Sequence, residues 1–367
     1  MLYDYLVVGA GLYGSVFAQQ MKKAGCSVLL IDKNSHVAGH VYDKNQNGVM
    51  LQVYGPHIFR TCNKLVWDYV SQFTKFNNYQ HKVKAISGGK IYSLPYCMAT
   101  FNQLWGCIRP DEAKAKIAEQ IIPNNNPQNF EEMALSRVGR DIYKTFLYGY
   151  TKKQWQRDPK ELPASIASRL PLRFTYNDNY FNDPHQGIPV DGYTAMIKRM
   201  IDGVDLGLNL DFFSIDDWHK LAHKLVFSGP IDKLFDYCYG DLEYLTLRFE
   251  HMTIDGDFQG TTVVNYTDES IPFTRVTEHK HFLNPDCPRS IVTHEFPDLW
   301  HRDKTPYYPV VDDKNRAKHL QYMQLVNKDI IIGGRLGNFQ YYNMDQVIGC
   351  ALQDTKHELE QNTSLDR

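Results

Sequence analysis

Three glycines near the start of the chain have the spacing that binds a diphosphate. Residues 9–14 read Gly-Ala-Gly-Leu-Tyr-Gly, which is the G-x-G-x-x-G pattern of dinucleotide-binding proteins. In that pattern Gly9 makes a tight turn, Gly11 lets the backbone approach a pyrophosphate, and Gly14 lets a helix pack on a strand. The free N–H groups at the start of the helix would then face the phosphate oxygens.

The residues around these glycines predict the elements that must position them. Residues 6–8 are apolar and predict a buried strand, and residues 15–21 predict a helix. Residues 27–31 predict a second strand, which ends in Asp32. An acid about 20 residues after the glycines is where a carboxylate binds a ribose hydroxyl. The combination predicts a dinucleotide-binding α/β domain, although a glycine turn of another α/β protein and a surface acid at Asp32 are the alternatives.

Length and composition narrow the class of protein. With 367 residues the chain exceeds one usual domain, so we expect two or three. A formal net charge of −2 argues against a nucleic-acid partner, which needs a basic face. The seven cysteines are scattered without a C-x-x-C pair, which favours the reducing cytoplasm and no metal site. We expect neither a signal peptide nor a membrane span, because no apolar stretch approaches the ~20 residues that a span needs.

The rest of the chain predicts a helical insertion and a second sheet. Residues 82–95 predict a β-hairpin, and residues 98–170 predict a helical block without a nucleotide fingerprint. The long segment 168–187, rich in Asn, Asp, Tyr and Pro, is interpreted as a functional loop. Further strands are predicted at 208–213, 225–227, 245–249, 261–266, 275–282, 290–296 and 330–332, and further helices at 64–73, 313–326 and from 345 onward.

Motifs along the whole chain are typical of one enzyme family. They lie at residues 8–11, 54–59, 149–155, 161–165, 169–174, 178–181, 186–189, 228–230, 274–280, 306–309 and 334–337. Through them the chain resembles the prokaryotic UDP-galactopyranose mutases from end to end. Unrelated flavoproteins share only the first of these motifs.

The resemblance implies an α/β fold in three parts: a Rossmann-like FAD-binding domain, an inserted helical domain and a mixed antiparallel sheet domain. The FAD-binding domain would comprise residues 1–75, 205–240 and 328–367. The helical substrate domain would comprise residues 98–195, with a mobile loop at about 167–187. The mixed-sheet domain would comprise residues 76–97 and 241–327.

The resemblance also implies a redox-neutral isomerisation of UDP-galactopyranose to UDP-galactofuranose. FAD must be reduced, and its N5 attacks the anomeric carbon as UDP leaves. The sugar then closes again through its 4-hydroxyl, and UDP returns. A UDP-sugar is the expected substrate, and a homodimer is the expected assembly.

The family pattern assigns residues to this chemistry. The catalytic residues would be Arg169, Arg275 and His57. Substrate contacts would come from Arg60, Phe146, Tyr150, Trp155, Tyr180, Asn265, Tyr308 and Tyr341. Cofactor contacts would come from Gly9, Gly11, Gly14, Asp32, Lys33, Gly39, His40, Arg335 and Asn343. Arginine suits a diphosphate because its planar fork bonds phosphate oxygens in pairs. From the residues alone, however, His57 and Trp155 could equally be core residues and Arg169 a solvated one.

Several positions depart from the family pattern. Arg60 replaces a histidine and resembles members that accept UDP-GalNAc. His40 replaces an asparagine after Ala38-Gly39, Leu245 replaces an arginine, and Asn343 replaces an aspartate. These departures leave UDP-galactose, UDP-GalNAc and dTDP-fucose open as substrates. A flavin oxidoreductase of the same fold and a non-catalytic nucleotide-binding relative are the alternatives to a mutase.

Overall fold

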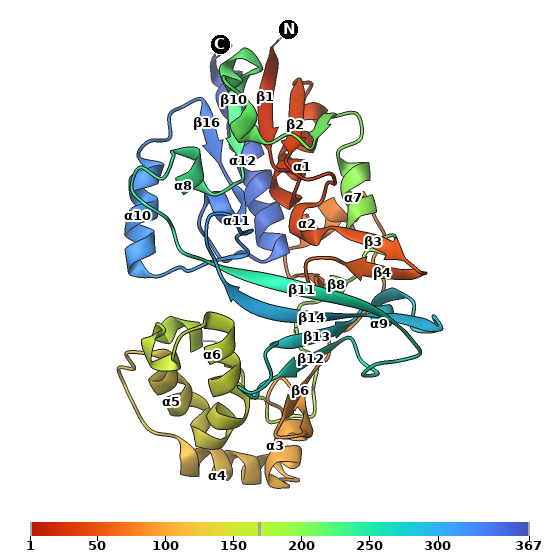
Figure 1. The fold of residues 1–367 in the computed structure, drawn as a ribbon, viewed down its shortest axis with the longest axis vertical. Helices are drawn as coiled ribbons and strands as arrows, with labels where there is room; N and C mark the ends of the chain where they lie inside the picture. The colour runs from red at the N-terminus through yellow and green to blue at the C-terminus, as the bar shows by residue number, and fades with distance from the viewer. Residues whose placement is uncertain (1, 168–169, 366–367) are drawn as a thin grey trace.

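The computed structural model describes residues 2–167 and 170–365, and its first layer is a parallel β-sheet (Figure 1). Five strands lie in the order β16-β10-β1-β2-β9, and every neighbouring pair is parallel. They are β1 (Tyr3–Val8), β2 (Val28–Asp32), β9 (Asp205–Leu208), β10 (Ala222–Phe227) and β16 (Ile330–Ile332). The order reverses direction next to β1, and a sheet of this kind binds ligands at that point, beyond the carboxyl ends of the strands.

Apolar residues on both faces of the central strands explain why this sheet forms. Val7 and Leu30 pack into the core beneath α1 (Leu12–Lys23) and α12 (Met344–Leu365). Leu6 and Ile31 point into a separate core on the other face. Such two-sided burial is typical of parallel strands. The predicted strand–helix–strand unit around the glycine turn is thus confirmed.

A second, mixed sheet crosses the middle of the molecule. Its seven strands lie in the order β15-β11-β14-β13-β12-β6-β7. They are β6 (Val83–Ser87), β7 (Lys90–Leu94), β11 (Tyr244–Asp255), β12 (Val263–Tyr266), β13 (Arg275–Glu278), β14 (Arg289–Leu299) and β15 (Tyr308–Pro309). Only the β12–β6 pair of this sheet is parallel. Figure 1 shows the long β11–β14 pair lying between the parallel sheet and the helical block.

The helical block is built as predicted, but one part of it is not an α-helix. Its elements are α3 (Met98–Trp105), α4 (Pro110–Gln120), α5 (Phe130–Ile142), a π-helix (Tyr143–Tyr148) and α6 (Gly149–Trp155). Pro110 begins α4, and the side chain of Asn129 caps α5 by accepting the N–H of Glu132. Gly139 kinks α5 with a φ of 79°.

The remaining elements are short or lie at the edges. Two small antiparallel pairs are β3 (Asp43–Gln46) with β4 (Val49–Gln52), and β5 (Phe59–Thr61) with β8 (His185–Gly187). The other α-helices are α2 (Lys64–Val70), α7 (Tyr193–Met200), α8 (Ile231–Leu234), α9 (Lys280–Leu283), α10 (Asp313–Met323) and α11 (Gly334–Gly337). Single 3-10 turns lie at Gly39–Val41, Pro159–Glu161, Ala164–Ala167, Phe212–Ser214 and Trp218–Lys220. Within residues 2–167 and 170–365, no helix combines the length and apolarity that a bilayer crossing requires.

Two predicted strands end earlier than expected, because in each the chain turns into a short helix. The strand predicted at 208–213 ends at Leu208, since the Asp211 carboxylate accepts the N–H of Phe213 and starts a 3-10 turn. The strand predicted at 275–282 ends at Glu278, and α9 follows. There Lys280 turns away to pair with Asp257 at 2.8 Å.

Helix α7 belongs to the core of the parallel sheet. The Asp43 carboxylate accepts the N–H groups of Tyr193 and Thr194 and so holds the start of α7 on β3. Tyr193, Met196 and Ile197 are buried in the same core as α1. The domain boundary expected at residue 195 therefore falls inside one helix, and the division into three domains remains a prediction.

His279 joins the mixed sheet to β4 as a buried, uncharged side chain. Its Nδ1 accepts the N–H of Gln52 at 3.3 Å, so Nε2 carries the proton and donates to Thr293 Oγ1 at 2.7 Å. Burial lowers the pKa of His279 to about 3. In the unfolded chain this imidazole titrates near 6.5.

This difference predicts acid destabilisation that a single substitution removes. Below pH 6.5 the unfolded chain binds a proton at this imidazole, whereas folded His279 stays unprotonated down to about pH 3. The free energy of unfolding therefore decreases as the pH is lowered. Between pH 7.5 and 5.5 the loss from this residue is about 1.4 kcal/mol. His279→Gln keeps a donor and an acceptor but does not titrate. Urea unfolding at both pH values should show a smaller loss for the variant, and equal losses would contradict the assignment.

Candidate active site

One cavity of about 570 Å³ joins the two sheets. Its floor comes from the carboxyl ends of β1 and β2, where the glycine turn lies. Its opposite wall includes Asn265 of β12, Arg275 of β13 and Tyr308 of β15. Glycines and cations that are far apart in the sequence therefore face one cavity.

The glycine turn leaves bare backbone on the cavity floor. A Cβ on Gly9 would lie 2.3 Å from Ser228 Oγ, and a Cβ on Gly14 would lie 2.0 Å from the Gly9 carbonyl oxygen. Gly11 and Gly39 face each other so closely that a Cβ on Gly39 would lie 3.0 Å from Gly11 Cα. Helix α1 starts at Gly11 with neither a side-chain cap nor an acid in its first turn. Its first N–H groups thus remain available to an anion.

Asp32 closes the glycine turn and also lines the cavity. Its Oδ2 accepts the N–H of Ala10 at 2.8 Å, and its Oδ1 accepts the N–H of Asn34 at 2.8 Å. Because each carboxylate oxygen has two lone pairs, Asp32 can still accept a hydroxyl from a ligand. Lys33 follows it on the cavity wall.

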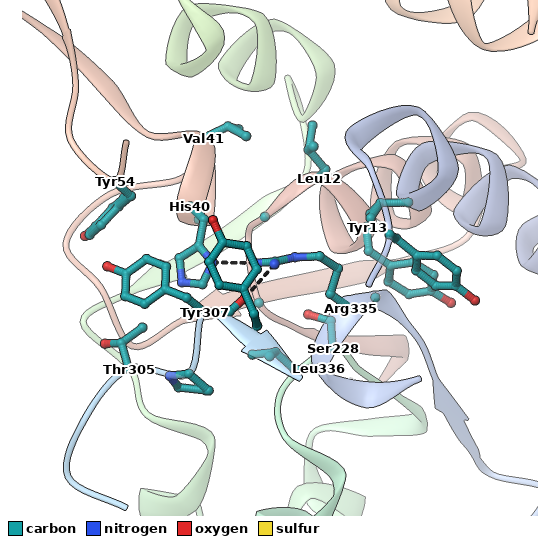
Figure 2. Close-up of a pocket in the computed structure, with 18 of the residues that line it drawn as sticks. Leu12, Tyr13, His40, Val41, Tyr54, Ser228, Thr305, Tyr307, Arg335 and Leu336 are labelled. Atoms are coloured by element: carbon teal, nitrogen blue, oxygen red, sulfur yellow. Dashed lines mark hydrogen bonds between the residues drawn. The ribbon is translucent and has the colours of Figure 1, made fainter. Parts of the chain in front are cut away.

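His40, Tyr307 and Arg335 form a platform beside the glycines (Figure 2). Arg335 Nη2 lies 2.8 Å from His40 Nδ1, and Arg335 Nη1 donates to the Tyr307 carbonyl. Arginine has only donors, so His40 Nδ1 must be the acceptor and the imidazole must be neutral. Burial and the Arg335 charge hold the pKa of His40 well below 6.5. The His40 ring stacks on Tyr307 at 4.6 Å, which extends a flat surface suited to a planar ligand.

His57 lines the same cavity as a neutral side chain. Its Nδ1 lies 2.9 Å from the carbonyl oxygen of Gly55 and therefore carries the proton. Burial lowers the pKa of His57 to about 4, and the charges of Arg335 and Arg275 contribute. At pH 7 the Nε2 atom of His57 is consequently an acceptor.

Arg275 is a cation whose partners are all distant. Its nitrogens lie 3.4 Å from Asn265 Oδ1, 3.3 Å from the Tyr150 hydroxyl and 3.5 Å from Glu295 Oε2. Glu295 stands opposite Arg275 in the β13–β14 register. Hydrogen bonds to charged groups are normally shorter than 3.0 Å, so these contacts leave the guanidinium able to bind a stronger acceptor.

Two tyrosines stand beside this cation. The Tyr308 and Tyr341 rings stack at 5.2 Å, and both line the cavity. Burial raises the pKa of Tyr308, so its hydroxyl remains a donor at neutral pH. Tyr180 lines the cavity from the segment before β8, and its N–H donates to the His81 carbonyl.

Arg60 is fixed at the cavity wall by its neighbours. Its Nη1 pairs with Asp183 Oδ2 at 2.9 Å, and its guanidinium carbon lies 4.4 Å from the centre of the Phe181 ring. Phe181 in turn stacks on His81 at 5.4 Å. The side chain that departs from the family pattern is therefore held toward the segment that precedes β8.

Most of the predicted site residues meet in this cavity. Those that line it are Gly9, Gly11, Asp32, Lys33, Gly39, His40, His57, Arg60, Tyr180, Asn265, Arg275, Tyr308, Arg335, Tyr341 and Asn343. Gly14 lies behind the turn and acts through packing. Arg169 lies outside the described residues, so its role stays a prediction.

Three predicted residues lie away from the lining. Phe146 is buried against Tyr92 at 5.0 Å, and Trp155 packs on the core of the helical block. Tyr150 lies behind Arg275 and touches it through its hydroxyl. Substrate contacts from Phe146, Tyr150 and Trp155 therefore remain predictions.

Sequence reasoning missed several residues of the cavity. They are Tyr13, Tyr54, His81, Phe181, Phe213, Lys233, Trp300, Arg302, Lys304 and Tyr307. Tyr54, Phe181 and Tyr307 lie in recognised motifs, and Tyr13 lies within the glycine pattern itself, so these four could have been found there. The other six lie outside those motifs, in loops and short helical turns that the fold brings together.

Comparisons with known proteins place the chain in a family. Residues 145–341 match the family model described as UDP-galactopyranose mutase, and residues 7–73 match an NAD(P)-binding Rossmann-like domain. A probable UDP-galactopyranose mutase of Klebsiella pneumoniae is 42% identical over 361 residues, which cover 95% of this chain and 93% of the relative. The dTDP-fucopyranose mutase of Escherichia coli is 40% identical, with 95% and 96% covered. The UDP-galactopyranose mutase of Mycoplasma pneumoniae is 30% identical, with 98% and 96% covered.

Solved structures support the same fold. The crystal structure of a reduced UDP-galactopyranose mutase superposes with a TM-score of 0.77 at 15% identity, covering 98% of this chain and 96% of that one. Putrescine oxidase bound to putrescine superposes with a TM-score of 0.58 at 14% identity, covering 98% and 99%. The predicted Rossmann-like α/β fold is confirmed. Because the family model spans more than half of the chain and relatives of 30–42% identity span nearly all of it, the chain belongs to the UDP-galactopyranose mutase family of isomerases.

Proposed function

We propose that the protein interconverts the pyranose and furanose forms of a nucleotide sugar, with UDP-galactose as the first candidate and FAD as the cofactor. The observation that carries this proposal is the single cavity that joins the glycine turn to Arg275 and the tyrosine pair. A mutase of this class needs its cofactor and the diphosphate of its substrate side by side in one site. The cavity offers both chemistries.

The floor of the cavity fits FAD. The bare backbone at Gly11 and Gly39 and the uncapped start of α1 suit its pyrophosphate, and Asp32 suits a ribose hydroxyl. The flat, neutral surface of His40 and Tyr307 suits an isoalloxazine ring. When bound in its reduced form, FAD would supply the nucleophile for the anomeric carbon.

The remaining wall supplies what a diphosphate leaving group requires. Arg275 would bind the phosphate oxygens, and the hydroxyls of Tyr308 and Tyr341 would donate to them. Arg169 is proposed as the second cation. His57 Nε2 is unprotonated at pH 7, so it would accept a hydrogen bond and would not act as an acid.

The identity of the hexose is a separate proposal. Relatives are named as mutases of UDP-galactopyranose and of dTDP-fucopyranose, at 42% and 40% identity. The paired Arg60 adds donors at the wall, which favours testing UDP-GalNAc as well. We also propose a homodimer on the family resemblance, and a cytoplasmic location that agrees with seven unpaired cysteines.

The direct test is turnover under reducing conditions. The holoenzyme is reduced with dithionite and incubated without oxygen with UDP-galactose, UDP-GalNAc and dTDP-fucose, and the products are separated by chromatography. A furanose product from at least one sugar supports the proposal. Turnover only with oxidised flavin and O₂ would favour an oxidoreductase, and UDP binding without turnover would favour a non-catalytic relative.

Gly11→Ala should separate cofactor binding from folding. The backbone at Gly11 (φ −79°, ψ −170°) accepts alanine, and the nearest atom to the new Cβ is 3.9 Å away. The variant should unfold within about 0.5 kcal/mol of the wild-type apoprotein. Its affinity for FAD should fall at least about tenfold, because the methyl group occupies the pyrophosphate position. Gly349→Ala is the control, because this helical glycine has room for a Cβ in ordinary van der Waals contact with Val66 at 3.8 Å. Unchanged FAD affinity in Gly11→Ala would contradict the assigned floor.

Arg275→Ala should lower turnover while FAD stays bound. Loss of one charge-stabilising donor set typically costs about 10²–10³ in kcat. Arg275→Lys keeps the charge beside Glu295 but loses the fork, so it should recover part of the rate. Arg289→Ala at the exposed end of β14 is the matched control. Loss of FAD absorbance in Arg275→Ala would show that the residue has been assigned to the wrong ligand.

A further inference from the structure

The helical block and the mixed sheet meet along a seam formed by residues 143–155 and residues 266–274. On the helical side lie the π-helix and α6. The Thr145 carbonyl accepts two hydroxyls, from Ser87 at 2.9 Å and from Thr267 at 2.7 Å. One carbonyl with two lone pairs thus binds both the β6–β7 turn and the segment after β12.

Gly149 brings the backbones at the seam into direct contact. A Cβ on this residue would lie 2.3 Å from the Thr267 carbonyl oxygen. The φ of Gly149 is −66°, which any residue adopts in a helix. Glycine is therefore required here because the Thr267 carbonyl leaves no room for a side chain. Helix α6 therefore begins against the segment that leads to Arg275.

Lys153 of α6 binds the same segment at three backbone carbonyls. Its Nζ donates to the carbonyls of Tyr266 at 2.7 Å, Ile271 at 3.0 Å and Phe273 at 3.0 Å. Those three bonds use every N–H of the ammonium group. Among the ion pairs of the described residues, none involves Lys153, whereas its neighbour Lys152 pairs with Glu269 in solvent. A buried ammonium group held only by carbonyls is costly to desolvate, which indicates a role beyond packing.

The seam ends at the cation of the active site. Phe273, an acceptor of Lys153, lies two residues before Arg275, and Tyr150 follows Gly149 directly. The Tyr150 hydroxyl accepts from Arg275 Nη2 at 3.3 Å across the seam. Because all partners of Arg275 are distant, its orientation depends on where the start of β13 is held.

We propose that Lys153 is a positioning residue: by holding residues 266–273 on α6, it sets the Arg275 guanidinium against Tyr150 and so shapes the diphosphate site. The ligand part of this inference rests on the proposed function. The contact between Lys153 and residues 266–273 needs no ligand and does not depend on that function. Without Lys153, three carbonyls lose their donor, the segment shifts, and the Arg275–Tyr150 contact opens.

The first experiment measures the seam without a ligand. Amide hydrogen exchange is followed in holoenzyme carrying Lys153→Met or the matched control Lys152→Met. Exchange across residues 266–275 should be at least tenfold faster in Lys153→Met and unchanged in Lys152→Met. Equal exchange in Lys153→Met and wild type would overturn the proposal. If Lys153→Met does not fold, Lys153→Gln, which keeps two of the three donors, should show the same change at smaller size.

The second experiment measures the link to Arg275. UDP affinity of the oxidised holoenzyme, measured by calorimetry, should fall at least tenfold in Lys153→Met, with FAD content unchanged. The double variant Lys153→Met/Tyr150→Phe should lose less UDP affinity than the product of the two single-variant losses predicts, because both substitutions act through the same Arg275–Tyr150 contact. The proposal would be overturned if Lys153→Met bound UDP within twofold of wild type, or if the losses of the two single variants simply multiplied in the double variant. Either result would leave Lys153 with a structural role alone.

These outcomes also distinguish the two proposals. If wild-type holoenzyme bound no UDP, the proposed function would fail. The exchange of residues 266–275 would still decide whether Lys153 holds the seam.

Discussion

The candidate active site depends on a half-buried cation, Arg275, that is only partly neutralised. Arg275 lies beside Glu295 at 3.5 Å, too far for the short, charge-assisted bond that would satisfy both groups. Removing a guanidinium from water without a close partner costs stability. In the proposed function, the phosphate oxygens of a bound substrate would complete the pairing and offset this cost. The incomplete ion pair is thus the clearest sign in the structure of where an anion belongs.

Two sheets surround this cation, and each supplies a different part of the site. The parallel sheet offers a floor without side chains, since Gly9 and Gly14 admit no Cβ and Gly11 faces Gly39. The mixed sheet offers charge and hydroxyls from β13 and β15. The two sheets act together, because the glycine turn beside the parallel sheet suits a pyrophosphate and Arg275 of the mixed sheet suits a second anion. The long β11–β14 pair, which lies between the parallel sheet and the helical block in Figure 1, brings them together.

The sequence predicted best what depends on local spacing. The glycine turn, the strand that ends in Asp32 and the β6–β7 hairpin are encoded within a few residues, and the structure confirms all three. Within the predicted helical block, the kink at Gly139 and the π-helix Tyr143–Tyr148 interrupt the regular helical spacing that leads to Phe146 and Tyr150. His81 and Trp300 line the cavity from loops, where no period marks a residue. The π-helix and the three-carbonyl site of Lys153 arise from tertiary contacts, so no motif revealed them.

The departures from the family pattern keep the electrostatics of the diphosphate wall intact. Leu245 pairs with Tyr308 in the β11–β15 register, and Asn343 lines the cavity at the start of α12. Relative to the family pattern, these positions lose one positive and one negative charge, so the net charge around the tyrosine pair is unchanged. Arg60 adds a positive charge, yet Asp183 pairs with it at 2.9 Å. The losses at positions 245 and 343 therefore cancel in charge, Arg60 adds one paired positive charge, and the set of donors and shapes on this wall changes. In the proposed function, selection among hexoses would depend on these donors and shapes, while Arg275 would still bind the diphosphate.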